Sequence, residues 1–368
     1  MVAGAGSNYR VKVRIALVST PFVPLPPPTY GGTELVVDAL VRALGRMGHE
    51  VTVFATGDSH APRLHSVFAR AVWPPDPYAE LVHCRAAARE IARGRFDVVH
   101  SHAPATLAFA DELGAPLVYT IHHAADAALA RYYASVPSSI RRVAISAKQA
   151  ELVSPAPDAV IHHGLDPSMY PDRGAGGDLA FFLGRLSWVK APDVAVEAAR
   201  RAGLRIVVGG SPHPEDAPPR WYEDVLEPAL RAPGVSWIPA VDLAAKRRLF
   251  ATVRALLVPL RWEEPFGLVM IEALLAGCPV IASARGSAPE LVLHGEDGFL
   301  VPAAAGPDEM ADALDAARGL DRAAIQARAR IRFSADRMAR DYVSVYRAAG
   351  ARGRAPHVAA EEAWTQVT

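Results

Sequence analysis

The fold of this chain is decided by the stretch Arg261-Trp262-Glu263-Glu264-Pro265-Phe266-Gly267-Leu268-Val269-Met270-Ile271-Glu272. It follows an apolar run at residues 255–259, which is typical of a buried strand. Pro265 and Gly267 suit the start of a helix, and Gly277 is a residue at which helices commonly end. Because the helix between them is almost wholly apolar, it must be buried. The stretch therefore predicts a strand, a charged loop and a core helix of an α/β protein.

Two glutamates in this stretch suggest a ligand. Glu264 and Glu272 are eight positions apart, which along a helix corresponds to about 12 Å. That is roughly the span from the ribose of a nucleotide to a hexose beyond its diphosphate. The free N–H groups at a helix start favour an anion between the two carboxylates. The pattern predicts a site for a nucleotide sugar; the alternative is a pair of solvated helix carboxylates.

This Glu-x7-Glu element, embedded in Glu-Pro-Phe-Gly, resembles the retaining GT-B glycosyltransferases of family 4, and the resemblance covers about residues 14–333. It implies an α/β fold of two doubly wound, Rossmann-like domains that face each other across a cleft. It also implies that Glu272 holds the ribose hydroxyls. The transferred sugar and the phosphates would be held by Glu264 and by the backbone of Phe266, Gly267, Leu268 and Val269.

The composition argues against several classes of partner. Lys plus Arg equals Asp plus Glu, 39 each, so no overall field attracts nucleic acid or an anionic membrane. Cys84 and Cys278 are too few for a disulfide framework and suit a reducing compartment. No apolar run is long enough to span a membrane. We expect a cytoplasmic enzyme, monomeric or homodimeric, without nucleic acid or membrane contact.

A chain of 368 residues is expected to form two domains. Strand-like runs alternate with helical segments from residue 14 onward, and a second such series begins at 179–183. We place an acceptor-side domain at residues 1–172 and a donor-binding domain at 173–339, joined by a hinge at 167–177. The last helix, at about 340–368, could pack back onto the first domain.

Two cations follow the first strand of the second series. Arg185 and Lys190 lie in Gly-Arg-Leu-Ser-Trp-Val-Lys, on a loop that turns into a helix. A guanidinium and an ammonium at a strand end can both reach a diphosphate. The family has a Gly-Arg-Leu…Lys segment with this role, and Arg185 and Lys190 match it. The alternative is a pair of ordinary surface cations, although the apolar residues before Arg185 are a poor setting for a solvated charge.

Gly31 and Gly32 lie at the end of the loop that connects the first predicted strand to the first predicted helix. Without Cβ atoms, their backbone can approach a phosphate closely. The form Tyr30-Gly31-Gly32-Thr33-Glu34 resembles a subgroup of family 4, but Gly-Gly is also common in loops. No Gly-x-Gly-x-x-Gly fingerprint follows any strand, which argues against a nicotinamide or flavin dehydrogenase.

Histidines gather at strand ends, in the pairs His100 and His102, His122 and His123, and His162 and His163. A zinc site is disfavoured because neighbouring residues on a strand point to opposite faces, and we expect neither a metal nor another cofactor. The resemblance implies that His122, in Thr-Ile-His, contacts the donor sugar. It leaves the roles of His102, His162 and His163 open.

Two further features remain ambiguous. Glu290 could bond a donor hydroxyl or serve the dipole of its own helix. Among the tryptophans at strand ends, one could flank the base, and core packing is the expectation for Trp237.

The resemblance implies transfer of a hexose from a nucleoside-diphosphate sugar to an acceptor hydroxyl, with retention of anomeric configuration. UDP is favoured over GDP or ADP, and the acceptor is expected to be a soluble small molecule or a saccharide. No carboxylate is available for double displacement, so front-face substitution without metal is expected. The alternatives are a GT-B epimerase or phosphorylase, or a non-catalytic protein that binds nucleotide sugars.

Overall fold

The computed structural model describes residues 12–28, 31–170, 174–213 and 217–350. Three predicted features fall partly outside these residues. They are Tyr30 of the Tyr-Gly-Gly-Thr-Glu motif, residues 171–173 of the hinge, and the part of the last helix beyond residue 350.

The first lobe is built on a parallel sheet with strand order β3-β2-β1-β4-β5-β6-β7. In β1, Ile15 pairs with Val51 on one side and with Val98 on the other. The central strands are apolar and buried, as expected for a parallel sheet covered on both faces. The strands are β1 (Arg14–Val18), β2 (Glu50–Phe54), β3 (Leu64–His65), β4 (Val98–Ser101), β5 (Leu117–Thr120), β6 (Arg141–Ala144) and β7 (Ala159–Val160).

The second lobe repeats this plan in a parallel sheet with strand order β10-β9-β8-β11-β12-β13. Two doubly wound α/β domains were predicted, and the structure confirms them. The predicted boundary near residue 172 stays a prediction, since the chain passes there through residues outside the described ranges. The strands are β8 (Leu179–Leu183), β9 (Arg205–Gly209), β10 (Val235–Ile238), β11 (Ala255–Val258), β12 (Val280–Ser283) and β13 (Gly298–Val301).

The helices cover both faces of each sheet, and many begin at a residue that caps the free N–H groups. Asp242 accepts from the N–H of Ala245 at 2.7 Å, and Asp126 caps α3 in the same way. The helices are α1 (Gly32–Arg46), α2 (Pro77–Arg93), α3 (Ala127–Ser135), α4 (Ala147–Leu152), α5 (Pro192–Arg201), α6 (Glu227–Leu230), α7 (Leu243–Thr252), α8 (Leu268–Leu275), α9 (Ala288–Leu291), α10 (Pro307–Ala316), α11 (Arg322–Arg332) and α12 (Ala335–Ala348).

In both sheets the strand order reverses beside the first strand. The reversal lies between β1 and β4 in one lobe and between β8 and β11 in the other. Ligands of open α/β sheets bind at this point, outside the carboxyl ends of the strands. The loops that follow these four strands carry Gly31, His102, Arg185 and Glu264. The topology therefore brings most of the predicted site to two facing sheet edges.

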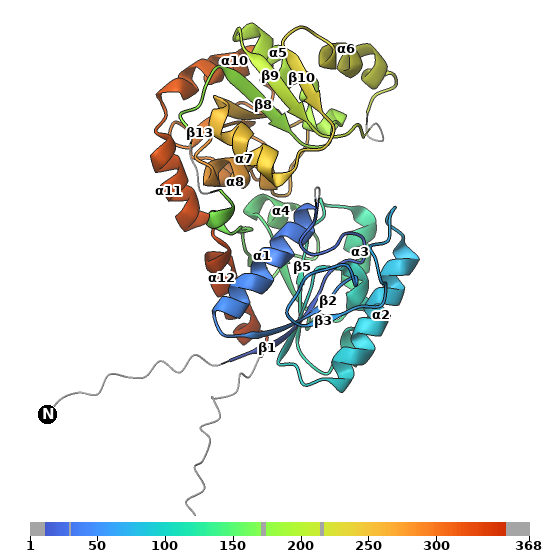
Figure 1. The fold of residues 1–368 in the computed structure, drawn as a ribbon. Helices are drawn as coiled ribbons and strands as arrows, with labels where there is room; N and C mark the ends of the chain where they lie inside the picture. Colours follow the sequence, from blue (N-terminus) through green and yellow to red (C-terminus); the bar gives the residue numbers. More distant parts are fainter. Residues whose placement is uncertain (1–11, 29–30, 171–173, 214–216, 351–368) are drawn as a thin grey trace, which may run out of the picture.

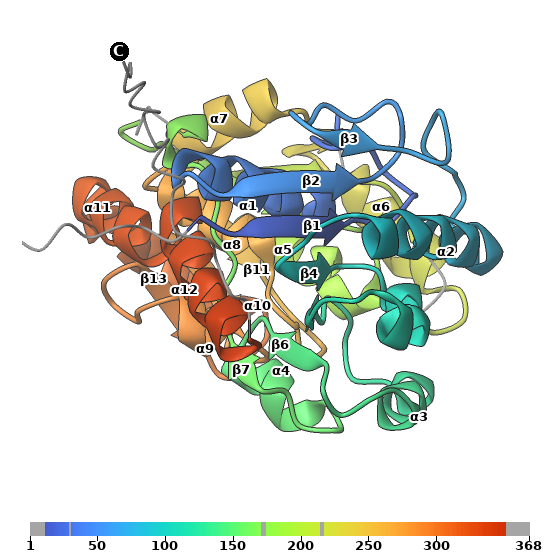
Figure 2. The ribbon, with the colours of Figure 1, turned by 90° about the horizontal axis from the view of Figure 1, so that it is seen from below.

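Helix α12 ties the end of the second series to the first lobe. Figure 1 shows α11 beside the upper lobe and α12 continuing down along the lower lobe, where it packs against α1. Seen from below in Figure 2, α12 crosses the side of the first lobe on which α1 also lies. Arg46 of α1 pairs with Asp336 of α12 at 2.6 Å, and Met338 is fully buried.

A helix over residues 222–230 begins as a π-helical turn at Tyr222–Leu226 and continues as α6. One local prediction, the core packing of Trp237, was wrong. Trp237 is 40% exposed rather than in the core, and its indole N–H donates to the carbonyl of Gly210 at 2.8 Å.

Replacing Met338 by Ala should lower the free energy of unfolding by about 2–5 kcal/mol, because it leaves a cavity where α12 packs on the first lobe. Ile331→Ala on the neighbouring helix α11 is a matched control. Its side chain is 76% exposed, so its effect should stay within about 0.5 kcal/mol. Urea denaturation measures both, and equal losses would contradict the packing of α12.

Candidate active site

The loop between β11 and α8 is held from behind by the loop that follows β12. The N–H of Gly286 donates to Glu263 at 2.7 Å, and the N–H of Ser287 donates to the carbonyl of Glu264 at 2.9 Å. Ser287 Oγ donates to the carbonyl of Phe266 at 2.5 Å. A Cβ atom on Gly286 would lie 2.8 Å from the Cα of Glu264, so only glycine allows this approach.

Helix α8 presents an open N-terminus toward the first lobe. Gly267 precedes it with φ 76°, and no side chain caps the helix. Within the described ranges, the N–H groups of Gly267, Leu268 and Val269 have no hydrogen-bond acceptor. A Cβ atom on Gly32 would lie 3.0 Å from Leu268 Cδ1, so the glycine pair of the first lobe faces this helix start. Gly31, with φ 156°, stands at the N-cap of α1.

Glu264 is 7% exposed and lies in the loop before α8, so it is not on the helix that carries Glu272. The spacing of about 12 Å expected along a helix therefore does not apply. Its carboxylate forms an ion pair with Lys190 and accepts from the indole N–H of Trp262 at 3.0 Å. Lys190 Nζ also lies 5.1 Å from the centre of the Trp262 ring. These contacts offset the cost of burying the carboxylate.

Arg261 joins the loop of Glu264 to the loop of Lys190. Its guanidinium makes two parallel bonds to Asp193, at 2.9 and 2.6 Å, and a third to the carbonyl of Trp188 at 2.9 Å. The backbone N–H of Arg261 donates to Val189 at 2.9 Å. A bidentate pair has a fixed orientation, so the two loops form one rigid unit.

Arg185 differs from the other cations around the site because it has no anionic partner. Its side chain is half-buried at the end of β8, and it makes no hydrogen bond or ion pair with any other residue that the structure describes. The loop is anchored on either side of it, since the N–H of Gly184 donates to the carbonyl of Gly209 at the end of β9, at 3.0 Å, and the N–H of Leu186 donates to that of Ser211 at 2.9 Å. The guanidinium is thus positioned by its backbone and free to meet an anion.

Glu272, in α8, has two partners that the sequence did not indicate. The hydroxyl of Tyr170 donates to Oε1 at 2.5 Å, and Lys246 of α7 donates to the same oxygen at 2.8 Å. Lys246 is one of the few lysines in the chain, but nothing in its neighbourhood in the sequence marks it. Both partners use Oε1, and within the described ranges no protein donor reaches Oε2.

Four histidines from three of the strand ends meet in a stack beside this unit. His102 Nδ1 lies 2.9 Å from His122 Nε2, and the ring of His100 packs 4.3 Å from that of His102. His163 stacks on His122 with ring centres 5.3 Å apart and meets Phe266 of the second lobe at 4.7 Å. The structure therefore brings His122 close to the loop that leads into α8.

The imidazoles of this stack are neutral at physiological pH. Burial, which disfavours the charged form, lowers the pKa of His100 and of His163 to about 3. Burial and the neighbouring imidazoles also lower the pKa of His102 and of His122 well below the ordinary value. Among the described residues, no group of three or more His, Cys, Asp or Glu is arranged to hold a metal ion.

Glu290 does not serve its own helix, which was one of the two roles expected. Its carboxylate reaches across to the first lobe and accepts from the N–H groups of Ala147 and Lys148, at 2.7 and 2.8 Å. His162 lies 2.8 Å from the same carboxylate. These contacts hold the two lobes together, and His162 takes part in them.

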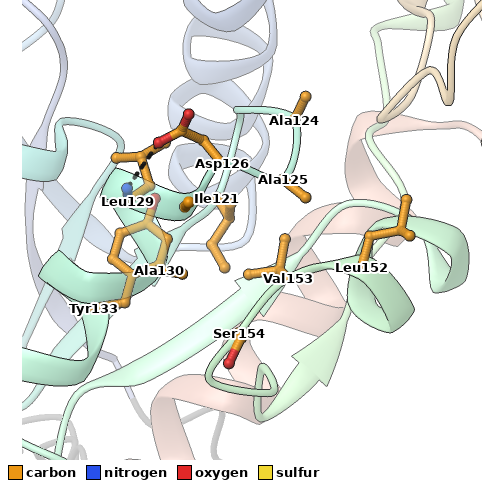
Figure 3. Close-up of a pocket in the computed structure, with 11 residues that line it drawn as sticks. Ile121, Ala124, Ala125, Asp126, Leu129, Ala130, Tyr133, Leu152, Val153 and Ser154 are labelled. Carbon is orange, nitrogen blue, oxygen red and sulfur yellow. Dashed lines mark hydrogen bonds between the residues drawn. The ribbon is translucent and has the colours of Figure 1, made fainter.

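A separate cavity of about 240 Å³ lies beside the loop that follows β5 (Figure 3). Its lining is mainly apolar, and its one charged group, Asp126, already caps α3. Ile121 lines the cavity, whereas His122, next in the chain, turns to the histidine stack. The cavity therefore offers no cation to a phosphate and is not the predicted donor site.

Comparison with known proteins identifies the family. Residues 30–168 match the model of "Glycosyltransferase Family 4", and residues 177–317 match that of "Glycosyl transferases group 1". A D-inositol 3-phosphate glycosyltransferase from Nocardioides is 30% identical, covering 92% of this chain and 90% of that protein. The chain belongs to glycosyltransferase family 4. It is a glycosyltransferase with the GT-B fold, as the sequence predicted.

Solved structures support the fold of this family 4 enzyme. AviGT4, a glycosyltransferase of avilamycin A biosynthesis, superposes with a TM-score of 0.71 at 24% identity, over 93% of this chain and all of that one. HepE from Anabaena, solved with UDP-glucose, gives a TM-score of 0.65 at 18% identity, over 91% of this chain and all of that one. No helix in the described ranges is both long and apolar enough to cross a membrane.

Replacing Gly286 by Ala should distort the Glu264 loop. Gly286→Ala should cost about 1–2 kcal/mol for its left-handed backbone, φ 56°, and about 1–3 kcal/mol more for the contact with Glu264. Gly295→Ala is the matched control, because it has φ 79° but open space around it. Urea denaturation compares the two variants, and equal losses would show that no close approach exists at Gly286.

Proposed function

We propose that this glycosyltransferase moves a hexose from a UDP-sugar to a hydroxyl of a soluble small molecule or saccharide, with retention of configuration and without a metal ion. The observation that carries the proposal is Arg185. A half-buried guanidinium that has no partner among the described residues stands at the strand-order reversal of the second lobe, in one rigid unit with Lys190 and the start of α8.

The diphosphate is assigned to these positive groups. Arg185 supplies a bidentate donor fork, and the free N–H groups of Gly267, Leu268 and Val269 add the positive end of α8. Lys190 stays paired with Glu264, because the buried carboxylate needs a positive partner, and its ammonium is assigned to a phosphate as a second, shared partner. Fixed positive charges of this kind stabilise the leaving diphosphate as its negative charge grows.

The two glutamates are assigned to hydroxyl groups on either side of the phosphates. No described residue donates to Oε2 of Glu272, which suits acceptance from the ribose hydroxyls, and Lys246 and Tyr170 hold its other oxygen. Glu264 is held by Lys190 and Trp262 and is assigned to hydroxyls of the transferred sugar. Gly31, Gly32 and His122 close the site from the first lobe.

Retention is proposed to occur by front-face substitution. The bond from the anomeric carbon to the diphosphate oxygen breaks as the acceptor oxygen bonds to that carbon on the same face. The acceptor's proton passes to an oxygen of the departing diphosphate. Double displacement would require a carboxylate beneath the anomeric carbon. Among the described residues, the hydrogen-bond and ring partners of His122 are His102 and His163, and neither is a carboxylate.

The choice of substrates is supported by relatives. HepE was solved with UDP-glucose, which supports uridine as the base. The Nocardioides relative is a D-inositol 3-phosphate glycosyltransferase by name, and such an acceptor is a small, soluble polyol. To identify the donor, a panel of UDP-, GDP- and ADP-sugars is tested for hydrolysis and for transfer. If none of them is turned over, the proposal is refuted.

Arg185→Ala should lower kcat by roughly 10²–10³-fold, because the growing charge on the diphosphate loses its bidentate partner. Arg231→Ala is the control, since this exposed arginine pairs only with Glu227 within the same lobe. Release of the nucleoside diphosphate measures both variants, and circular dichroism confirms that they are folded. Near-normal turnover of Arg185→Ala would refute the assigned role.

The product should keep the anomeric configuration of the donor, and EDTA should leave the rate unchanged. Retention follows from attack on the face that the leaving group occupies, and metal independence follows from the arginine, the lysine and the helix start. One-dimensional NMR of the anomeric proton reads the configuration directly. An inverted product would exclude the mechanism, and a rate lost in EDTA and restored by Mg²⁺ would exclude metal independence.

A further inference from the structure

His102 is a buried side chain whose two ring nitrogens lie in different surroundings. Its exposed fraction is 2%, and Nδ1 lies 2.9 Å from Nε2 of His122. Its Nε2 is buried and has no hydrogen-bond partner in the part of the chain that the structure describes. A buried polar atom without a partner costs stability, so an apolar side chain would pack at least as well in this position. The imidazole therefore serves something other than packing.

The unpartnered nitrogen decides which of the two histidines donates. If His122 donated from Nε2–H, His102 would carry its own proton on Nε2, and that N–H would be buried without an acceptor. If His102 donates from Nδ1–H, its Nε2 holds only a lone pair, and His122 carries its proton on Nδ1. Buried N–H groups without an acceptor are the rarer defect in proteins, so the second arrangement is favoured.

The rest of the stack keeps His102 in place. His100 packs against its ring at 4.3 Å and is itself held by two hydroxyls, those of Tyr346 and Thr120, each at 2.8 Å. Tyr342 donates to or accepts from Thr120 at 2.7 Å. Because both tyrosines belong to α12, the helix that joins the lobes also fixes the ring that meets His122.

His122 is half-buried, and its Nδ1 is neither bonded to a described residue nor sealed from solvent. This nitrogen is the one that can meet a substrate. His163 stacks along the ring of His122 and is itself met edge-on by Phe266, so the stack restrains the orientation of the His122 ring. The tautomer of His122 therefore decides whether the substrate meets a donor or an acceptor at this point.

We propose that His102 is a positioning residue that keeps the proton of His122 on Nδ1, so that a neutral N–H donor faces the transferred sugar. The effect of this tautomer on catalysis rests on the proposed function. A ring with its proton on Nδ1 and its Nε2 occupied by His102 can donate to a sugar or phosphate oxygen, but it has no free lone pair. It follows that His122 does not take the acceptor's proton, which leaves that task to the departing diphosphate.

Two variants of His102 test this inference. In His102→Leu the N–H that donates to His122 is lost, and His122 is free to exchange tautomers. The kcat should therefore fall by roughly 10–100-fold, while the affinity for the nucleotide sugar stays nearly unchanged. The thermal midpoint should stay level or rise, because the unpartnered nitrogen is removed. In His102→Asn the amide NH₂ can take the place of Nδ1–H, so most of the lost kcat should return.

The tautomer itself is read by ¹⁵N NMR of histidine-labelled protein, with the His122 signals assigned by their loss in His122→Gln. The wild type and His102→Asn should show a protonated Nδ1, and His102→Leu should show a shift toward protonated Nε2. Tyr346→Phe is the control, since it removes a buried hydroxyl from the same stack without touching the His102–His122 bond. Its His122 signals should stay unchanged.

A protonated Nε2 on His122 in the wild type would overturn the inference, as would a His102→Leu variant with unchanged tautomer and kcat. The NMR measurement needs no substrate, so the two proposals fail separately. If no nucleotide sugar is turned over but the His122 signals behave as expected, the proposed function is wrong and the tautomer assignment stands.

Discussion

A buried carboxylate must be neutralised where it lies, and in this protein that constraint shapes the candidate site of the second lobe. Glu264 is almost enclosed, so an ammonium from Lys190 and an indole N–H from Trp262 must reach it. Both come from loops that are themselves locked, through the paired bonds of Arg261 to Asp193 and the close approach of Gly286. The loop of Glu264 is thus rigid before any substrate arrives.

This rigidity explains why Arg185 stands out. Ion pairs satisfy Lys190, Lys246 and Arg261, and within the described ranges Arg185 has no anionic partner. Holding a guanidinium half-buried without a partner costs stability, and such costs gather at functional sites. A ligand with two negative charges would offset that cost, and the uncapped start of α8 follows the loop that Arg261 ties to the Lys190 loop.

The two lobes are joined by contacts of different kinds around this unit. Helix α12 supplies apolar packing and the tyrosines that hold His100, and Glu290 reaches from the second lobe to the start of α4. Between these, Gly32 meets Leu268, and His163 meets Phe266. The first lobe therefore touches the helix start that the donor phosphates are proposed to occupy. A family 4 enzyme built in this way couples the position of its histidines to the position of its lobes.

The sequence by itself determined the two doubly wound domains and the family, and it singled out the cations and glutamates that are proposed to bind the donor. It could do so because strands, helix starts and glycine turns are local features, and Arg185, Lys190, Glu264 and Glu272 lie within or beside them. Only the tertiary structure decided which side chains meet. The partners of Glu272 come from residues 170 and 246, and His102 meets His122 across two strands. Such pairings depend on strand order and on the return of α12, which no local pattern encodes. For the same reason neither role considered for Glu290 included its contact with the start of α4, and Trp237 was placed in a core from which β10, at the sheet edge, excludes it.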